Sequence, residues 1–355
     1  MRSAICRLSA SIGMAAFVIG TAYAQEAPGE IVVTANKREQ NLNDVGLTVA
    51  VVSGDVFKEQ QINSLADLAN ALPGLSYSNT ANGTPVFTLR GVGFNESSLA
   101  AYPTVSVYLD EIPLPFGALT RHSAYDLERV EVLKGPQGTL FGQNATGGAI
   151  NYIAAKPTSE LSAGLNLSYG RFNEVIAEGF ISTPLAEGLG VRVAARTEQR
   201  DGWQRSNTRQ GDRNGKLENY MGRILLAYDD GGPLRLLLNA NAWKDKSDTQ
   251  APQYIASNVQ NPVTDPVFDA TPFSPQRPRD ADWTPGTTDA NNRLWQTSLR
   301  GDLDLTDSIT LASLTSYVDY KQRQSDDGDG IASHNLDLTS DLGRIKSFSQ
   351  ELRLS

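Results

Sequence analysis

From residue 158 to the end of the chain, apolar and polar residues alternate in long runs. In the first run Leu161, Leu165 and Tyr169 fall on one face, and small or polar residues fall on the other. Successive side chains of a strand point to opposite faces, so this period of two predicts strands with one apolar and one polar face. Eight antiparallel strands are expected, at 161–170, 174–183, 189–196, 219–229, 234–241, 293–305, 309–322 and 348–354.

The lengths of these strands and of their connections favour a membrane wall over a soluble sandwich with one solvated face. The longest runs cover 13 and 14 residues, whereas ordinary strands have about five or six. From the second connection onward, short links (184–188, 230–233, 306–308) alternate with long ones (202–216, 247–292, 325–345). Outer-membrane barrels have short turns on one side and long loops on the other.

The first half of the chain has short predicted strands and helices instead of long alternating runs. A short β-prone segment at 31–35 is followed by a strand at 47–52 and a helix at 56–61 that Asp55 is expected to cap. Ser64 is expected to cap a second helix, which Pro73 and Gly74 end. Further short strands are expected at 75–78, 86–90, 105–109, 129–133 and 149–153. The pattern predicts a compact α/β domain that ends near residue 157.

These two parts differ in size in a way that predicts an incomplete barrel. Eight strands about 4.8 Å apart, tilted by roughly 40°, close to a diameter of about 16 Å. A domain of about 120 residues has a radius of gyration of about 14 Å and is therefore much wider. A barrel that encloses it needs around twenty strands, so we expect the chain to be a fragment or a truncated product.

The first 24 residues have the features of a secretory signal. Arg2 and Arg7 precede a short apolar run, and Ala22 and Ala24 form a small-residue site that predicts cleavage before Gln25. Removing this segment takes two positive charges and the single cysteine, Cys6, from a chain whose formal charge is already −9. The acidic balance argues against a nucleic-acid partner, and no later run of 18 apolar residues predicts a spanning helix.

Several segments carry a family resemblance. Residues 127–142 (LERVEVLKGPQGTLFG), continued by 147–151 (GGAIN), closely resemble the plug signature of TonB-dependent outer-membrane receptors. Residues 88–93 (TLRGVG) resemble a second plug motif, and 31–35 (IVVTA) resemble the TonB box. The resemblance implies a signal peptide at 1–24, a TonB-box segment at 25–36, a plug at 37–157 and a partial transmembrane β-barrel at 158–355.

The TonB box implies a binding partner. A free edge strand near the mature N-terminus can join a partner's sheet through main-chain hydrogen bonds, although an ordinary first strand of the plug is the alternative. The resemblance implies that the partner is periplasmic TonB, which acts with ExbB/ExbD. The residues expected to bind TonB are Glu30, Ile31, Val32, Val33, Thr34 and Ala35.

The plug motifs supply glycines and charges. Gly91, Gly135, Gly142, Gly147 and Gly148 would permit tight turns. We expect ion pairs between plug and barrel wall from Arg90, Arg129, Glu131 and Lys134, with pairing inside the plug as the alternative.

Substrate contacts are expected from the outward loops of the plug. The candidates are Phe94, Asn95, Tyr102, Phe116 and His122, and packing of these side chains against the barrel is the alternative.

Signals for an enzyme are incomplete. The glycine-rich segment 135–142 lacks the Gly-Lys-Ser/Thr of a phosphate loop, and His122 and His334, the two histidines, lack zinc-site spacing. Residues 326–330 (DDGDG) hint at calcium but lack the glutamate of an EF-hand loop, so an acidic solvated loop is expected. We predict a protein that is not an enzyme and holds no cofactor or metal.

The sequence thus predicts a monomeric receptor, embedded in outer-membrane lipid, for active uptake of a scarce extracellular substrate. A ferric siderophore is the default cargo that the resemblance implies, and vitamin B12 and glycans are served by the same family. The alternatives are a passive porin or adhesin barrel, a secreted β-rich hydrolase, and a truncated remnant that cannot insert.

Overall fold

The computed structural model describes residues 32–38, 40–60, 62, 64–80, 82–96, 98–256, 266–275, 277–333 and 336–355. The predicted signal peptide at 1–24 lies outside these residues, as do Glu30 and Ile31 at the start of the predicted TonB box.

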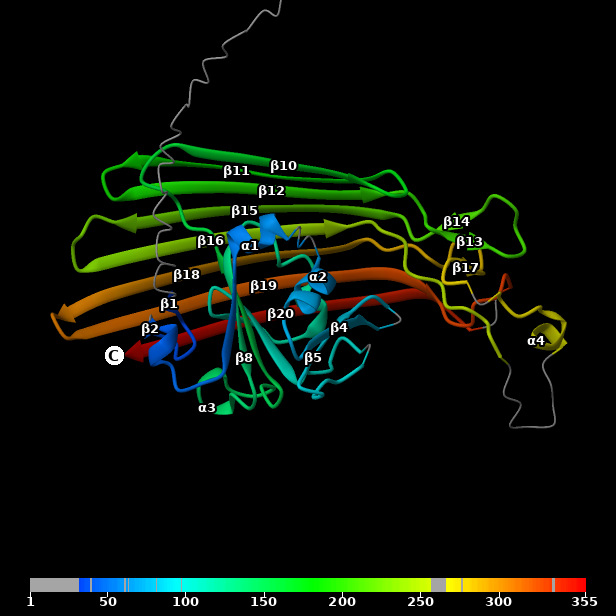
Figure 1. Cartoon of the computed structure of the whole chain (residues 1–355), viewed down its shortest axis with the longest axis horizontal. Helices are drawn as coiled ribbons and strands as arrows, with labels where there is room; N and C mark the ends of the chain where they lie inside the picture. Colours follow the sequence, from blue (N-terminus) through cyan, green and yellow to red (C-terminus); the bar gives the residue numbers. More distant parts are fainter. Residues whose placement is uncertain are drawn as a thin grey trace, which may run out of the picture.

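The second half of the chain forms one open antiparallel sheet, which confirms the predicted wall of eight strands (Figure 1). Each strand pairs with the next one in the wall, so β10 and β20 lie at the two edges. The strands are β10 (Ser162–Gly170), β11 (Glu174–Ala186), β12 (Leu189–Arg200), β15 (Leu217–Asp229), β16 (Leu234–Asp245), β18 (Asn292–Thr306), β19 (Ile309–Asp327) and β20 (Asp337–Leu354).

Two long connections hold structure that the alternation pattern did not reveal. The strands β13 (Gln204–Ser206), β14 (Arg213–Asn214) and β17 (Asp280–Ala281) form a small separate sheet, and α4 (Pro266–Ala270) lies in the same region. The predicted loop at 325–345 is wrong, because β19 and β20 continue to pair, through a register shift between Gln324 and Asp326, until Asp327 lies opposite Asp337. These polar ends extend past the alternating segment, where water can solvate both faces of a strand.

The two faces of the wall have opposite character. Leucine side chains at the predicted lipid face are exposed, and Leu165 is 73% exposed. Arg192, on the other face of the wall, is buried, with 6% of its surface exposed. Figure 1 shows the plug packed on that second face, with the short turns at the left and the long loops at the right. Alternation along each strand therefore provides an apolar outer surface and a polar seat for the plug.

The plug is built on a five-stranded mixed sheet in the order β3-β8-β9-β6-β7, in which β6 and β9 are parallel. Two hairpins, β1–β2 and β4–β5, and several short helices flank it. The strands are β1 (Val32–Val33), β2 (Gln40–Asn41), β3 (Val49–Ser53), β4 (Leu75–Asn79), β5 (Pro85–Leu89), β6 (Val105–Leu109), β7 (Ile112–Leu114), β8 (Leu127–Lys134) and β9 (Gly148–Ala154). The helices are η1 (Leu42–Asp44), α1 (Gly54–Glu59), α2 (Leu65–Ala71), η2 (Gly117–Thr120) and α3 (Gly138–Phe141).

Local signals at the two plug helices had different outcomes. Ser64 caps α2 as predicted. Its side chain accepts the Asp67 backbone N–H, and the Asp67 carboxylate accepts the Ser64 backbone N–H, which together form a capping box. The Asp55 cap is wrong, because α1 begins at Gly54 and the Ser53 hydroxyl accepts the Val56 backbone N–H instead. No helix in the described ranges has the length and apolar character needed to cross a bilayer.

The lipid-facing assignment makes a prediction about depth. Leu299 lies on the outer face near the middle of β18, whereas Ile309 begins β19 beside a short turn. Leu299→Arg is expected to lower the free energy of unfolding by about 2–4 kcal/mol and Ile309→Arg by about 0–1 kcal/mol, because a cation is most unfavourable at the bilayer midplane. Urea unfolding of the protein in lipid vesicles measures both, and equal losses would contradict this orientation.

Candidate functional site

The predicted TonB-box segment is docked on the plug. Val32 and Val33 pair with Asn41 and Gln40, and the side chains of Val33 and Ala35 are fully buried. β1 pairs with β2 alone, in a two-stranded sheet, so one of its edges has no partner strand, while the buried side chains of Val33 and Ala35 dock the segment on the plug. Only Val32 of the described box residues keeps an exposed side chain.

A single buried carboxylate anchors this segment. Glu131 lies in β8, a strand with neighbours on both sides, and is fully buried. Its oxygens accept the Thr34 backbone N–H at 3.0 Å and the Thr34 hydroxyl at 2.9 Å, and Asn151 donates to the same hydroxyl at 3.2 Å. Arg129 Nε donates to Glu131 at 2.8 Å and balances its charge. Thr34 is thus the connection between the box and the plug core.

The plug–wall ion pairs predicted from the signature are wrong. Arg129 pairs with Glu128 and Glu131, and Lys134 Nζ donates to the Pro73 carbonyl, so these groups bond inside the plug. Arg90 occupies a turn with φ of 51°, and its backbone N–H bonds to Gly74. The signature charges lie on strands and turns that face neighbouring plug elements, and for that reason they do not reach the wall.

Among the motif glycines, Gly148 has the strictest requirement. Its φ is +144°, and a Cβ there would lie 2.2 Å from the Leu133 carbonyl oxygen. Gly91, Gly135 and Gly142 also have positive φ, which side chains other than glycine seldom adopt. Gly147 has no positive φ, but a Cβ would press on Val92 and Val105.

Other residues make the polar contacts between plug and wall. In the β6–β7 turn, buried Glu111 pairs with Arg300 of β18 at 2.6 Å and with Arg353 of β20. The neighbouring carboxylate, Asp110, accepts the Asn239 amide at 2.8 Å and the Ala154 backbone N–H at 2.9 Å. The two carboxylates therefore bridge one plug turn to three wall strands.

A second contact lies just before β8. Asp126 accepts Arg192 Nε at 2.9 Å, and Arg223 Nη1 donates to the carbonyls of Tyr125 and Asp126 at 3.0 and 3.2 Å. The Tyr125 hydroxyl donates to Asn241 at 2.5 Å. All of these side chains are buried. These residues were not among those predicted from the sequence. The available signal was arginines on the inward face of wall strands whose residues alternate in polarity.

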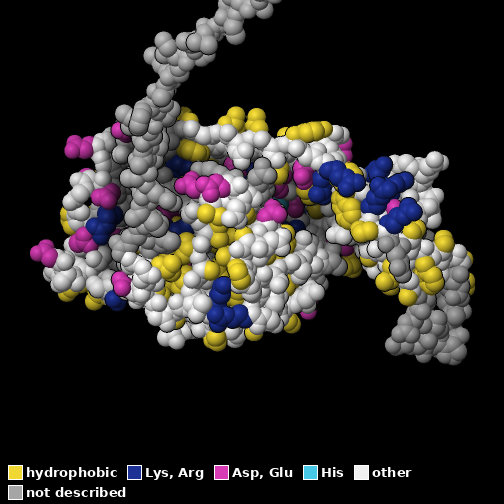
Figure 2. Space-filling view, viewed as in Figure 1, with side chains coloured by type: hydrophobic (Ala, Val, Ile, Leu, Met, Phe, Trp, Pro, Cys, Tyr) yellow, Lys and Arg dark blue, Asp and Glu magenta, His cyan; other side chains and the backbone are white. Residues whose placement is uncertain are grey.

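At the long-loop end, plug and wall enclose a cavity of about 330 Å³. His122 lines it, packs edge-on against Trp243 at 5.0 Å and lies 3.6 Å from the Asp245 carboxylate. The cavity is also lined by basic, acidic and aromatic side chains, among them Arg121, Arg196, Arg200, Glu198, Asp245, Asp248 and Trp203. Figure 2 shows Lys and Arg side chains gathered at this end of the molecule, at the right.

The remaining substrate candidates lie apart from this cavity. Tyr102 stacks on Phe116 with ring centroids 4.9 Å apart, and Phe94 and Asn95 are exposed. None of these four lines the cavity. Of the predicted contacts, His122 is the one that the fold brings to the cavity, and the arginines beside it were not predicted.

One cluster of three aspartates is a candidate metal site because its carboxylates converge. Oxygens of Asp327, Asp329 and Asp337 lie within 4.8 Å of one another at the base of the β19–β20 loop. The Asp327 carboxylate already accepts the Thr284 and Gly330 backbone N–H groups at 2.8 and 2.7 Å. Those bonds orient it toward the loop backbone. Asp327 is buried at the end of β19, so the predicted acidic solvated loop is wrong at this position.

Comparison with known proteins identifies the plug. The family model of the TonB-dependent Receptor Plug Domain matches residues 41–149. The siderophore receptor PiuA from Acinetobacter baumannii superposes with a TM-score of 0.70 at 18% identity, covering 89% of this chain and 43% of that one. Residues 41–149 therefore belong to the TonB-dependent receptor plug family. Members of this family are transport receptors, and the predicted location in the bacterial outer membrane is confirmed.

The curated relatives are named for different ligands. The chain is 31% identical over 169 residues to the pesticin receptor of Yersinia pestis, covering 46% of this chain and 24% of that protein. It is 30% identical over 203 residues to the vitamin B12 transporter BtuB of Vibrio vulnificus, covering 54% and 32%. The matched region thus spans about a third or less of these relatives.

The two carboxylates of the β6–β7 turn make a matched pair for a stability test. Burial raises the pKa of Asp110, so its charged form destabilises the folded state and stability falls as pH rises above the unfolded value near 4. Asp110→Asn keeps an acceptor for Ala154 and removes this decline. Glu111→Gln leaves Arg300 and Arg353 without their shared carboxylate and is expected to lose about 3 kcal/mol.

Thermal unfolding of the receptor in detergent, followed between pH 4 and 8, measures both variants. A receptor that tolerates Glu111→Gln as well as Asp110→Asn would show that the wall arginines do not depend on the plug turn.

Proposed function

We propose that this receptor performs TonB-energised uptake of a scarce extracellular substrate, with TonB, supported by ExbB/ExbD, engaging the segment around Val32–Val33 from the periplasm. In this proposal residues 25–36 are the TonB-binding segment, 37–157 the plug and 158–355 the barrel wall. The observation that carries it is the bond from Thr34 to Glu131, which joins the box to the plug core.

The position of Glu131 makes this bond a path for mechanical force. β8 pairs with β3 on one side and β9 on the other, and the Glu131 carboxylate lies between them and the box. Tension on Thr34 is therefore applied at an interior strand of the plug sheet. The box has a short hairpin partner, β2, of two residues, so a partner strand that binds Val32 and Val33 through the main chain replaces few hydrogen bonds.

The cavity at the long-loop end supports an anionic cargo, and a ferric siderophore is the class that we propose. Arg121, Arg196 and Arg200 line it beside His122, against the carboxylates of Glu198, Asp245 and Asp248. Arg196 is already bound by Glu178 and Glu198. Arg200 is less engaged, since it lies 3.7 Å from Glu174 and donates one hydrogen bond, to the Gly215 carbonyl at 3.2 Å. It is the cation best able to meet a ligand acid group.

The energised mechanism predicts that main-chain chemistry matters at Val32. Val32→Pro removes a backbone donor that strand addition needs, so uptake is expected to fall to background while surface binding persists. Val32→Ala keeps the backbone and removes the exposed side chain, so uptake is expected to remain near the wild-type rate. Transport and binding of labelled ferric siderophores by cells producing each variant test this, and unchanged uptake by the proline variant would favour a passive barrel.

The cavity predicts a second pair of variants. Arg200→Ala is expected to weaken ferric siderophore binding about tenfold, because a charge-assisted hydrogen bond contributes about 1.5–3 kcal/mol. Arg205→Ala removes an exposed cation of β13 that does not line the cavity. Quenching of Trp203, which lines the cavity, reports binding. Equal weakening by both variants would assign the effect to overall charge instead of the cavity.

A further inference from the structure

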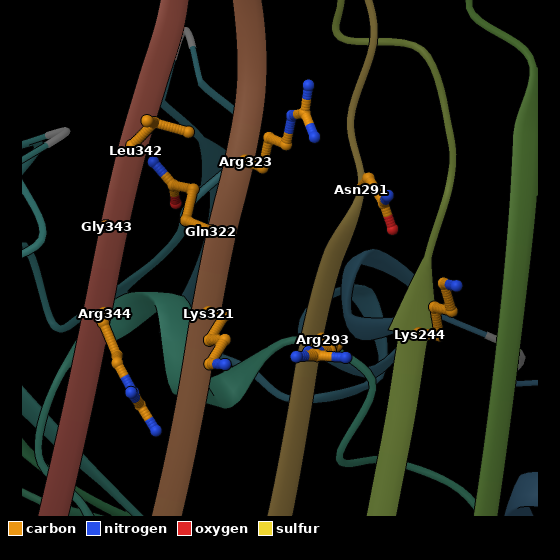
Figure 3. A pocket seen from close by; sticks show the side chains of 9 residues that line it. All are labelled: Lys244, Asn291, Arg293, Lys321, Gln322, Arg323, Leu342, Gly343 and Arg344. Atoms are coloured by element: carbon orange, nitrogen blue, oxygen red, sulfur yellow. The ribbon is translucent and has the colours of Figure 1, made fainter.

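A row of cations crosses the outer face of the wall near its long-loop end (Figure 3). Lys244 of β16 lies opposite Arg293 of β18, Arg293 opposite Lys321 of β19, and Lys321 opposite Arg344 of β20. We call these four residues the cation row. With strands about 4.8 Å apart, the row is about 14 Å long.

The row belongs to the outward face. Lys244 follows Leu234 and Leu236 at even spacing along β16, and those leucines are exposed on the side away from the plug. Arg293 is in phase with exposed Trp295 and Leu299 on β18. None of the four cations can therefore contribute to the plug–wall contacts.

The row is electrostatically unfavourable without a counterion. Like charges directly opposite each other destabilise a sheet, and here the same sign repeats across four strands. One acidic side chain neutralises part of this positive charge, since Asp319 accepts Arg344 Nε at 3.1 Å. Within the residues that the structure describes, Lys244, Arg293 and Lys321 make no salt bridge. An external anion would relieve this repulsion.

The height of the row places that anion at a membrane border. Trp295 to Leu305 are the outward apolar part of β18, and this length, tilted by roughly 40°, spans about 25 Å along the membrane normal. That equals the apolar band of an outer-membrane barrel. Arg293 lies one outward position beyond Trp295. The row therefore stands at the headgroup level of the outer leaflet.

Two adjoining hollows complete the surface. One, of about 540 Å³, lies among Lys244, Arg293, Lys321 and Arg344. The other, of about 580 Å³, shares the first three of these cations and continues over Gly222 and Ala242 between Tyr220 and Trp295. Gly222 and Ala242 face each other in register and leave a depression beside large aromatic rings. The second hollow, which Asp319 also lines, is thus charged at one end and apolar at the other.

We propose that this surface binds an outer-leaflet glycolipid, with its headgroup phosphates on the cation row and an acyl chain over Gly222 and Ala242. Charge complementarity identifies the phosphate, and the apolar end of the second hollow identifies a lipid instead of a soluble anion. The inference depends on the orientation of the wall and is independent of the cargo and of TonB.

The test uses detergent-purified receptor freed of lipid and titrated with lipopolysaccharide micelles, with binding measured by thermal shift and native mass spectrometry. The triple variant Lys244→Gln, Arg293→Gln and Lys321→Gln is expected to bind at least tenfold more weakly. A matched triple, Arg205→Gln, Arg213→Gln and Lys216→Gln, removes three charges from exposed loop residues and is expected to bind as the wild type does. Heat-modifiable migration on gels checks that both remain folded.

Two further arms separate the sources of phosphate. Enzymatically dephosphorylated lipopolysaccharide is expected to lose most of its affinity for the wild type, and inorganic phosphate at equal concentration is expected to produce no comparable shift. Equal binding of dephosphorylated lipid, equal loss in the matched triple, or full competition by inorganic phosphate would each overturn the proposal.

Discussion

Charged and polar groups that pair across the plug–wall interface hold the plug on the wall. Arg192, Arg223 and Arg300 point from wall strands toward the plug, and Asp126, Glu111 and two backbone carbonyls of the plug receive them. Removing a charge from water is unfavourable unless a partner and good hydrogen bonds replace the water. The same alternation along the strands that places these arginines on the plug side places the apolar side chains on the outer face.

The same bonds explain how a plug can be both firmly placed and movable. Polar contacts lose less than apolar contacts when water replaces them, because both partners can be hydrated again. The described interface combines such groups, including the Asn239 and Asn241 amides, with apolar wall side chains such as Trp243 and Tyr320 that belong to the same core cluster as the plug. The box–plug connection through Thr34 lies on the short-turn side, and the arginine-lined cavity lies at the opposite end. In the proposed TonB-energised uptake, force and cargo would therefore act on the plug from opposite sides.

Much of the local structure followed from periodicity. The eight wall strands were predicted because lipid and the plug impose opposite polarity on alternate residues, for example on Leu236 and Arg235. The capping box of α2 was predicted from Ser64 and a short apolar run. The strand β7 and the helix α3 were not predicted. Their few residues, with Pro113 and Gly138 among them, have no period long enough to detect.

The sequence by itself determined the two-part architecture, the plug family and the outward face of the wall, because each of these depends on order along the chain. Only the tertiary structure decided which charges meet. It directed the signature residues Arg129 and Glu131 to the box instead of the wall, and it aligned Lys244 with Arg344 across strands a hundred residues apart in the chain. Pairing between distant residues depends on sheet register and on the seating of the plug, and no local pattern of residues encodes either one.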